Sequence, residues 1–231
     1  MEYKEKRNFS ISQGPDCSSS FCYEIASEYR CLKGLPIYSG ECRMMKALWA
    51  DLQHTGNIPR KFQKINIGNT EPFNSELKDY IQNMKEKIKK GSGLIFQGQV
   101  GTGKTTQAIL ILSAALSHGF LAAYFLPFLS DFVVKLDSFN TKEEKFAFIG
   151  YLQRTPLLVV DDFFLDNISP ANEAIFWAII TKRFDNEKST IFTMNLSKND
   201  TFAIPANIKD RLSSTCKIID MRGVSRRGKE F

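Results

Sequence analysis

The stretch Gly98-Gln99-Val100-Gly101-Thr102-Gly103-Lys104-Thr105 decides the fold, because it fits the phosphate-binding loop pattern G-x-x-x-x-G-K-[ST] at every fixed position. A short apolar run with strand character, 94–96, precedes it, and apolar residues at helical spacing follow it from 105 to 118. Strand, glycine loop and helix in this order form the context that the pattern needs, which makes a chance glycine turn the weaker interpretation. The chain is therefore expected to bind a nucleoside triphosphate.

The loop also predicts individual roles. Its backbone N–H groups and the N-terminus of the following helix would point at bound phosphates. The Lys104 side chain would reach the β- and γ-phosphates, and the Thr105 hydroxyl would ligate Mg²⁺. The residues expected to bind the nucleotide here are Gly98, Gly101, Thr102, Gly103, Lys104, Thr105 and Thr106.

Length and composition favour one domain of ordinary size with a smaller appendage. The chain has 231 residues, of which 43% are hydrophobic and 24% charged, as in globular proteins. The net charge of +6 permits contact with nucleic acid without demanding it, since most basic residues are interleaved with acidic ones. No apolar run approaches the roughly 20 residues of a membrane span, and the charged N-terminus lacks the apolar stretch of a secretory signal. We therefore expect a cytoplasmic protein with no membrane partner and with reduced cysteines.

The composition changes near residue 66, which predicts an N-terminal cysteine-containing segment over 1–66 and a separate domain with the glycine loop over 67–231. Helices are expected at roughly 40–52 and, as one continuous helix with an apolar stripe, from 74 to about 90. Beyond the glycine loop, apolar runs predict strands at 120–126, 157–160, 190–193 and 216–221. Helices are expected between them, at 132–134, 142–153, 170–185 and 207–212. Such alternation predicts an α/β fold, with a parallel sheet flanked by helices on both faces.

Asp161 and Asp162 directly follow the buried run at 157–160. A carboxylate at the carboxyl end of a buried strand, beside a glycine loop, lies where a nucleotide crevice opens. Asp161 would hold Mg²⁺ through a water molecule, and Asp162 would orient or deprotonate the attacking water. Hydrolysing enzymes of this kind usually have Glu in the second position, so the shorter Asp162 puts the rate of hydrolysis in question. A turn signal at a strand end is the alternative interpretation.

The strand at 190–193 leads into Asn195, whose amide could hydrogen-bond the γ-phosphate or the attacking water. An Asn in an ordinary loop is the alternative. A small-molecule kinase would instead need an acceptor pocket and an Arg-rich mobile lid after the central strands, and the sequence offers no such segment.

Together, Gly98–Thr106, Leu157–Asp162, Thr193–Ser197, Ile208–Ser213 and Gly223–Arg227 resemble the AAA+ ATPase domain of helicase loaders of the DnaC/DnaI type. The resemblance covers about residues 58–231 and begins at a lead-in resembling the family's, Ile58-Pro59-Arg60-Lys61-Phe62. The aspartate pair also occurs in that family. The resemblance implies an AAA+ P-loop fold without a long C-terminal lid.

The resemblance places Asn195 at the first sensor position and Arg211 at the arginine finger. A finger acts on the γ-phosphate of a neighbouring subunit, which implies a homo-oligomer assembled through the ATPase domain. An ordinary surface arginine paired with Asp210 or another neighbour is the alternative for Arg211. Arg226 and Arg227 resemble the family's closing arginine motif and would bind nucleotide, or would simply form a solvated basic tail.

Cys17, Cys22, Cys31 and Cys42 gather in the N-terminal segment. Four thiolates could form a structural Zn²⁺ site, and loaders similar to DnaI can carry a zinc-bearing module that docks on the helicase. Cysteines also serve as small buried hydrophobes, and the spacing here lacks a tight C-x-x-C pair.

The resemblance implies an ATP-dependent loader that binds the hexameric replicative helicase and helps to place it on single-stranded DNA, with ATP and Mg²⁺ as cofactors. An IstB-like ATPase that assists a transposase has much the same core. A P-loop small-molecule kinase and a nucleotide-gated adaptor that hardly hydrolyses ATP are the further alternatives.

Overall fold

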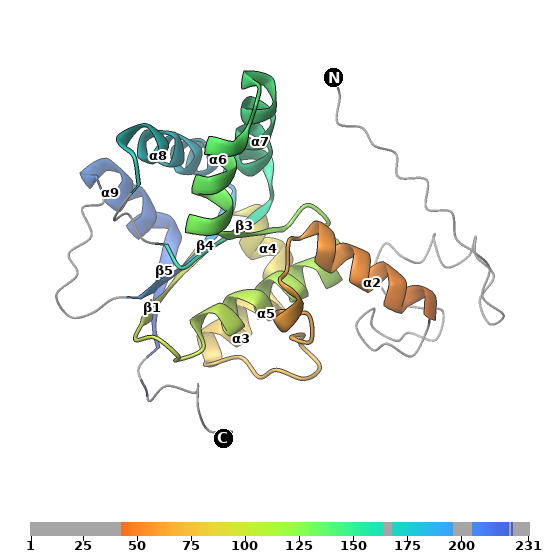
Figure 1. Ribbon diagram of the computed structural model, residues 1–231. Helices are drawn as coiled ribbons and strands as arrows, with labels where there is room; N and C mark the ends of the chain where they lie inside the picture. Colours follow the sequence, from red (N-terminus) through yellow and green to blue (C-terminus); the bar gives the residue numbers. More distant parts are fainter. Residues whose placement is uncertain (1–42, 164–167, 196–204, 222, 224–231) are drawn as a thin grey trace.

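A five-stranded parallel sheet in the order β2-β3-β4-β1-β5 forms the centre of the molecule (Figure 1). The computed structural model describes residues 43–163, 168–195, 205–221 and 223. The strands are β1 (Gly93–Gly98), β2 (Tyr124–Pro127), β3 (Leu157–Asp161), β4 (Ser189–Asn195) and β5 (Cys216–Asp220). The parallel sheet expected from the alternation of strands and helices is thereby confirmed.

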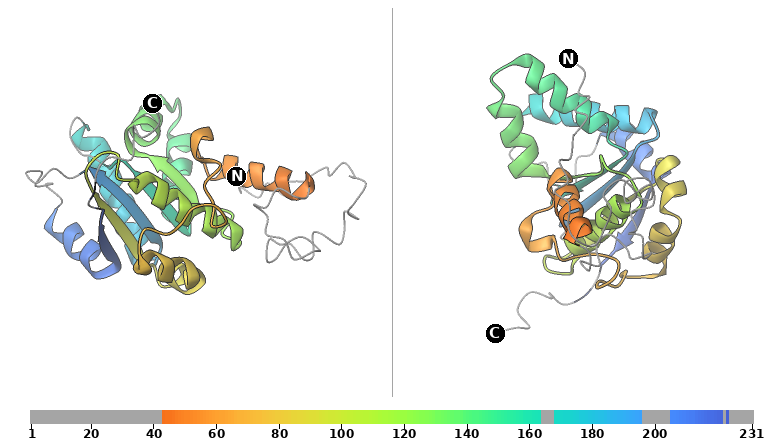
Figure 2. Two further views of the ribbon diagram at one scale, coloured as in Figure 1. Left: turned by 90° about the horizontal axis from the view of Figure 1, so that it is seen from below. Right: turned by 90° about the vertical axis from the view of Figure 1, so that its right-hand side faces the viewer.

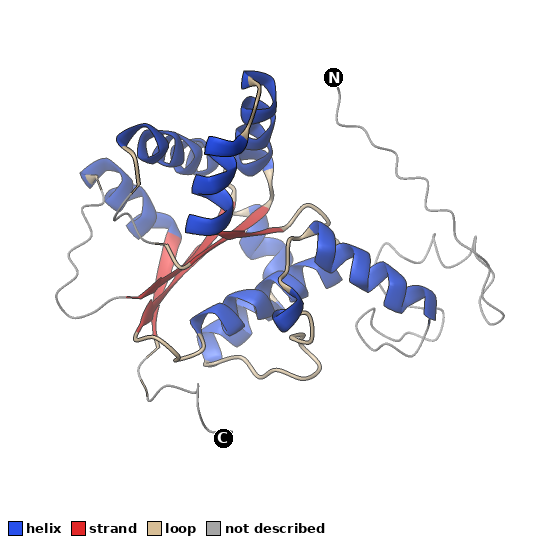
Figure 3. Ribbon diagram, in the orientation of Figure 1, coloured by secondary structure: helices blue, strands red, loops and turns tan. Residues whose placement is uncertain are grey.

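Helices pack against both faces of the sheet (Figures 1–3). Neighbouring side chains of a strand point to opposite faces, so Phe96 joins one hydrophobic cluster and Ile95 the other. The first cluster includes α2 (Arg43–Thr55), α3 (Ser75–Gln82), α4 (Met84–Lys89) and α5 (Lys104–Ser117). The second includes the π-helical turn η4 (Phe128–Val133), α6 (Val134–Ser138), α7 (Lys142–Arg154), α8 (Pro170–Asp185) and α9 (Ala206–Thr215). Every helix in the described ranges is too short or too polar to span a bilayer.

Helix α5, which follows the glycine loop, is buried on almost every side. The sheet covers one side, while α2 and the connector between α2 and α3 cover much of the rest. Ser113 donates a hydrogen bond to the Ile65 carbonyl over 2.9 Å, and the Gln107 amide oxygen accepts one from the Phe73 N–H over 2.9 Å. The apolar stripe expected on α5 is therefore only part of a helix that is apolar nearly all round.

The chain preceding residue 66 also contacts this core. Trp49 and Leu52 of α2 are buried in the same cluster as α5. The Phe125 N–H donates to the Gly56 carbonyl over 2.8 Å, and the Asn57 amide donates to the Phe125 carbonyl over 2.9 Å. Residues 56–57 thereby satisfy backbone groups on the outer edge of β2.

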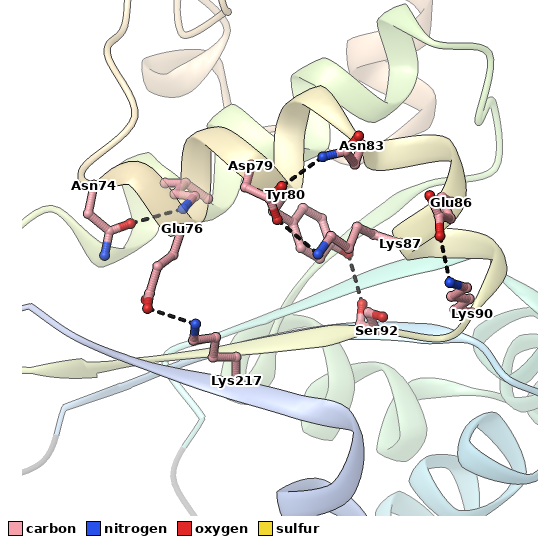
Figure 4. Close-up of polar contacts among 11 residues, drawn as sticks. Asn74, Glu76, Asp79, Tyr80, Asn83, Glu86, Lys87, Lys90, Ser92 and Lys217 are labelled. Carbon is pink, nitrogen blue, oxygen red and sulfur yellow. Dashed lines mark hydrogen bonds and ion pairs between the residues drawn. The ribbon is translucent and has the colours of Figure 1, made fainter.

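The continuous helix expected from residue 74 is wrong, because the chain forms α3 and α4 with a break at Asn83 (Figure 4). Asn83 has φ −102° and ψ 24°, outside the helical region. Its side-chain amide donates to the Asp79 carboxylate over 2.7 Å, and Lys87 pairs with the same carboxylate over 2.9 Å. Asn is a weak helix former, which favours a break here, and the apolar side chains on both sides of it still join one hydrophobic cluster. Asn74 caps the start of α3, since its side chain accepts a hydrogen bond from the Leu77 N–H.

The strand expected at 120–126 begins only at Tyr124. Gly119, at φ 94°, ends α5, and the Phe120 N–H returns to the Ala115 carbonyl over 3.0 Å. The Ala123 N–H then bonds the Phe120 carbonyl over 2.8 Å. Residues 120–123 thus form a helix-ending turn, whose apolar content imitated a strand. The helix expected at 40–52 is described over Arg43–Thr55, and that expected at 170–185 forms α8.

Candidate functional site at the carboxyl end of the sheet

The glycine loop leaves β1 at the carboxyl end of the sheet and enters α5. Gly98, Gly101 and Gly103 have φ values of 146°, 86° and 96°, which favour glycine. At Gly98 a Cβ atom would lie 2.4 Å from the Met221 carbonyl oxygen, so a larger residue cannot enter without moving the backbone. The Met221 N–H bonds the Gln97 carbonyl over 2.8 Å, which holds the chain after β5 beside the loop. These contacts fix the direction in which the loop departs from the sheet.

The Lys104 side chain crosses the glycine loop. Its ammonium donates to the carbonyl oxygens of Gly98 over 2.8 Å and Gln99 over 2.7 Å. The Thr102 hydroxyl donates to the Gln99 carbonyl over 3.0 Å. Lys104 is 6% exposed, so its charge is concentrated inside the loop, where it can meet an anion.

Asp161 ends β3 next to the start of α5. Its carboxylate accepts a hydrogen bond from the Thr193 hydroxyl over 2.7 Å, and Thr105 lies within hydrogen-bonding reach. Burial raises the pKa of the Asp161 carboxyl above its usual value, and the hydrogen bonds from Thr193 and Thr105 oppose this shift. The fold therefore brings together Thr105 and Asp161, the two residues expected to hold a metal ion.

Asp162 turns the chain after β3. Its φ of 55° is left-handed, a conformation that Asp adopts more readily than most residues. Its N–H donates to the Thr193 hydroxyl over 2.9 Å, and its carboxylate accepts a hydrogen bond from the Asn195 amide. The contact between Asn195 and Asp162 joins the ends of two adjacent strands at the mouth of the site.

These oxygen donors fit Mg²⁺. In the described part of the chain, no three His, Cys, Asp or Glu side chains gather into a metal-binding cage. Magnesium at a nucleotide needs no such cage, because it keeps waters and binds phosphates together with one or two protein oxygens. The Thr105 hydroxyl and the Asp161 carboxylate supply hard oxygen donors of that kind at the entrance to α5.

Arg211 lies on α9, away from the glycine loop of its own chain. Its guanidinium pairs with the carboxylate of Asp185 at 3.1 Å and lies 5.0 Å from the centre of the Phe184 ring. Asp185 ends α8, just before β4 begins, so the pair lies towards the amino ends of the strands. The glycine loop and Asp161 lie at the carboxyl ends of the strands, so Arg211 lies towards the opposite ends of the same strands.

Six predicted site residues lie outside the described residues. They are Arg226, Arg227 and the four cysteines Cys17, Cys22, Cys31 and Cys42. The region after β5, where a long C-terminal lid would follow, also lies outside the described residues, apart from residues 221 and 223.

Two residues that the sequence did not single out as part of the site are prominent in the structure. Thr193 contacts both aspartates, and its position two residues before Asn195, on the same side of a strand, is the signal that could have revealed it. Arg183 is fully buried and supports the sheet from α8. Its guanidinium donates to the carbonyls of Leu152 and Thr155, each over 2.7 Å, to the Ser189 carbonyl, and over 2.9 Å to the Thr190 hydroxyl.

Solved structures share this fold. The crystal structure of the DnaC helicase loader matches with a TM-score of 0.57 at 23% identity, over 71% of this chain and 100% of that chain. The DnaI crystal structure matches with a TM-score of 0.57 at 19% identity, over 71% and 95% of the two chains. AMPPCP-bound DnaA from Aquifex aeolicus matches with a TM-score of 0.52 at 18% identity, over 64% and 44%. At these identities the likeness shows an AAA+ P-loop fold like that of DnaC.

No protein of curated function matches the sequence. The family model described as IstB-like ATP binding protein matches residues 80–230, well over half of the chain. The match includes the glycine loop, both aspartates, Asn195 and Arg211. The chain therefore belongs to the family of IstB-like ATP-binding proteins.

Proposed function

We propose that this ATP-binding protein is an ATP-dependent loader, which binds the replicative DNA helicase and helps to place it on single-stranded DNA. The observation that carries the proposal is a hydrogen bond between the carboxyl ends of β3 and β4, which the Asn195 amide donates to the Asp162 carboxylate. A group that links the water-orienting carboxylate to the neighbouring strand can respond to the γ-phosphate. A loader that acts through nucleotide-dependent contacts needs such a response, whereas a small-molecule kinase needs an acceptor pocket instead. The likeness to a structure entitled DnaC helicase loader, over that whole chain, supports the same function.

The site supports ATP hydrolysis with each residue in a defined role. The loop N–H groups and Lys104 bind the β- and γ-phosphates, and Thr105 and Asp161 hold Mg²⁺. When bound, Mg²⁺ would neutralise the charge that develops on the phosphate oxygens. Asp162 accepts the proton of the attacking water, and Asn195 orients that water or the γ-phosphate.

Arg211 completes the site of a neighbouring subunit. Its place towards the amino ends of the strands keeps it from the phosphates of its own chain, while its partly exposed side chain can reach an adjacent protomer. In the single chain Arg211 forms a surface ion pair with Asp185. To act as a finger, its guanidinium would have to leave Asp185 when the subunits assemble. We therefore propose a homo-oligomer formed through the ATPase domain.

Residues 1–66 are proposed to dock on the helicase. The later part of this segment, from Trp49 on, packs against α5 and so connects the segment to the ATPase domain. A zinc site formed by Cys17, Cys22, Cys31 and Cys42 would stabilise that segment.

The family match favours a second candidate, an ATPase that assists a transposase, because the matching model is named for IstB. A capture experiment separates the two. The host replicative helicase is tested for binding to the full chain with and without ATP, with Lys104→Ala as the nucleotide-binding control and with a purified transposase in parallel. Stoichiometric capture of the helicase supports the loader. Capture of the transposase alone replaces it with the second candidate.

A further inference from the structure

Thr193 lies between the two aspartates, and the roles assigned so far do not include it. The residue is 2% exposed, at the end of β4 that faces the site. Its hydroxyl donates to the Asp161 carboxylate over 2.7 Å and accepts from the Asp162 N–H over 2.9 Å. A hydroxyl has one proton to donate, so that proton is committed to Asp161.

The backbone of Thr193 holds the same turn. Its carbonyl accepts from the Phe163 N–H over 2.9 Å, so one residue of β4 contacts three successive residues after the buried part of β3. Phe163 is 1% exposed, and its ring packs at 4.9 Å from Phe128 and 5.1 Å from Phe176, measured between ring centres. This aromatic cluster anchors the far end of the turn, while the Thr193 hydroxyl fixes the end that carries the carboxylates.

Thr193 and Asn195 each donate a hydrogen bond to one of the two carboxylates. Residues two apart on a strand point to the same side, and here Thr193 contacts Asp161 while Asn195 contacts Asp162. The position of each carboxylate is thus set from β4 and not by β3 alone. Groups that hold a metal-binding side chain in place fix its orientation, so losing one lowers metal affinity although the binding residue itself remains.

We propose that Thr193 is a positioning residue, which orients the Asp161 carboxylate towards Mg²⁺ and sets its separation from Asp162. The inference rests on the proposed nucleotide site, and it adds a residue to that site that acts only through its neighbours. Valine at this position keeps the shape and the strand propensity of threonine but removes both side-chain hydrogen bonds. Serine keeps the hydroxyl and loses one methyl group.

The test measures the binding of a fluorescent ATP analogue by the full chain in Mg²⁺ and in EDTA, for the parent, Thr193→Val and Thr193→Ser. The ratio of the two affinities reports how much Mg²⁺ strengthens binding, and it requires no turnover. Thr193→Val is expected to lower this ratio by roughly 10- to 100-fold, the usual effect of losing a group that supports a metal ligand. Binding in EDTA should stay at the parent's level, and Thr193→Ser should recover most of the ratio.

An unchanged ratio in Thr193→Val, or a Thr193→Ser variant that behaves like valine, would overturn the positioning role. If the parent itself fails to bind the analogue, or gains nothing from Mg²⁺, the proposed nucleotide site is wrong and this inference falls with it. Thermal unfolding of each variant shows whether it is folded. Should Thr193→Val not fold, Thr193→Cys replaces it, because a thiol of similar size is only a weak donor. A full ratio in the cysteine variant would then count against the proposal.

Discussion

Replacing Arg211 by alanine should separate catalysis from folding. In the structure the guanidinium contacts Asp185 at 3.1 Å and lies 5.0 Å from the centre of the Phe184 ring, with the two charged side chains 31% and 49% exposed. An ion pair with this much solvent contributes about 0.2–1 kcal/mol, and an exposed cation–π contact adds about 0.5–1 kcal/mol. The substitution should therefore lower the free energy of unfolding by only about 1–2 kcal/mol.

The expected effect on turnover is far larger. A guanidinium that stabilises a transferring phosphoryl group contributes about 10³- to 10⁵-fold to the rate. A stability loss of about 1–2 kcal/mol leaves a protein of ordinary stability almost fully folded, so it cannot imitate such a rate change. Nucleotide affinity should remain close to that of the parent, because Arg211 makes no contact with the glycine loop of its own chain.

Three measurements test this reasoning. ATP turnover and fluorescent nucleotide binding are compared for the parent and Arg211→Ala. Asp185→Asn serves as the matched control, since it removes the ion pair but keeps the guanidinium, and its turnover should be retained. Arg211→Ala is then mixed with Lys104→Ala, which lacks a working phosphate loop. Mixed assemblies should recover turnover, because one subunit supplies an intact site and the other an intact finger.

The finger assignment is refuted if mixing restores no activity, or if Arg211→Ala loses binding as much as turnover. If Asp185→Asn proves as inactive as Arg211→Ala, the protein requires the ion pair itself and not a free guanidinium.

Further predictions concern the water-orienting carboxylate, the phosphate loop and the buried support of the sheet. Asp162→Asn should keep the left-handed turn, bind ATP with Mg²⁺ normally and lose about 10²- to 10⁴-fold in turnover, as for a general base; unchanged turnover would favour a nucleotide-gated adaptor. Lys104→Ala should abolish nucleotide binding in a direct titration while the thermal unfolding of the free protein changes little. Arg183→Met leaves buried carbonyls without their partner and should lower the free energy of unfolding by about 3 kcal/mol, or Tm by roughly 6–12 °C in calorimetry, with ATP affinity retained below Tm.

The buried Arg183 shows why part of the structure cannot be predicted from the sequence alone. Burial lowers the pKa of Arg183 to about 9, which still leaves the guanidinium protonated at neutral pH. The side chain stays charged because oxygens from the end of α7 and from β4 accept its hydrogen bonds: the carbonyls of Leu152, Thr155 and Ser189 and the hydroxyl of Thr190. Those oxygens come from residues between 152 and 190, and no local pattern reports that they meet.

Local signals were reliable where one short segment carries all the chemistry. The glycine loop needs only its own backbone and the two elements that flank it, so its sequence predicts both its place and its conformation. The run at 157–160 ending in two aspartates predicts a buried strand with carboxylates at its tip for the same reason. Apolar content was misleading at 120–123, where a turn after Gly119 buries the same kinds of side chain as a strand.

The sequence by itself therefore determined the class of the protein: a parallel sheet, a phosphate loop and an acidic pair at a strand end, because each follows from periodicity and short-range spacing. Only the tertiary structure decided how those parts are held in register. Thr193 joins Asp161 to β4 across 32 positions of the chain, and Arg211 turns to Asp185 and not to the adjacent Asp210. Such contacts depend on which strands become neighbours and on which helix faces meet. These outcomes are set by the packing of the whole core, and no residue encodes them alone.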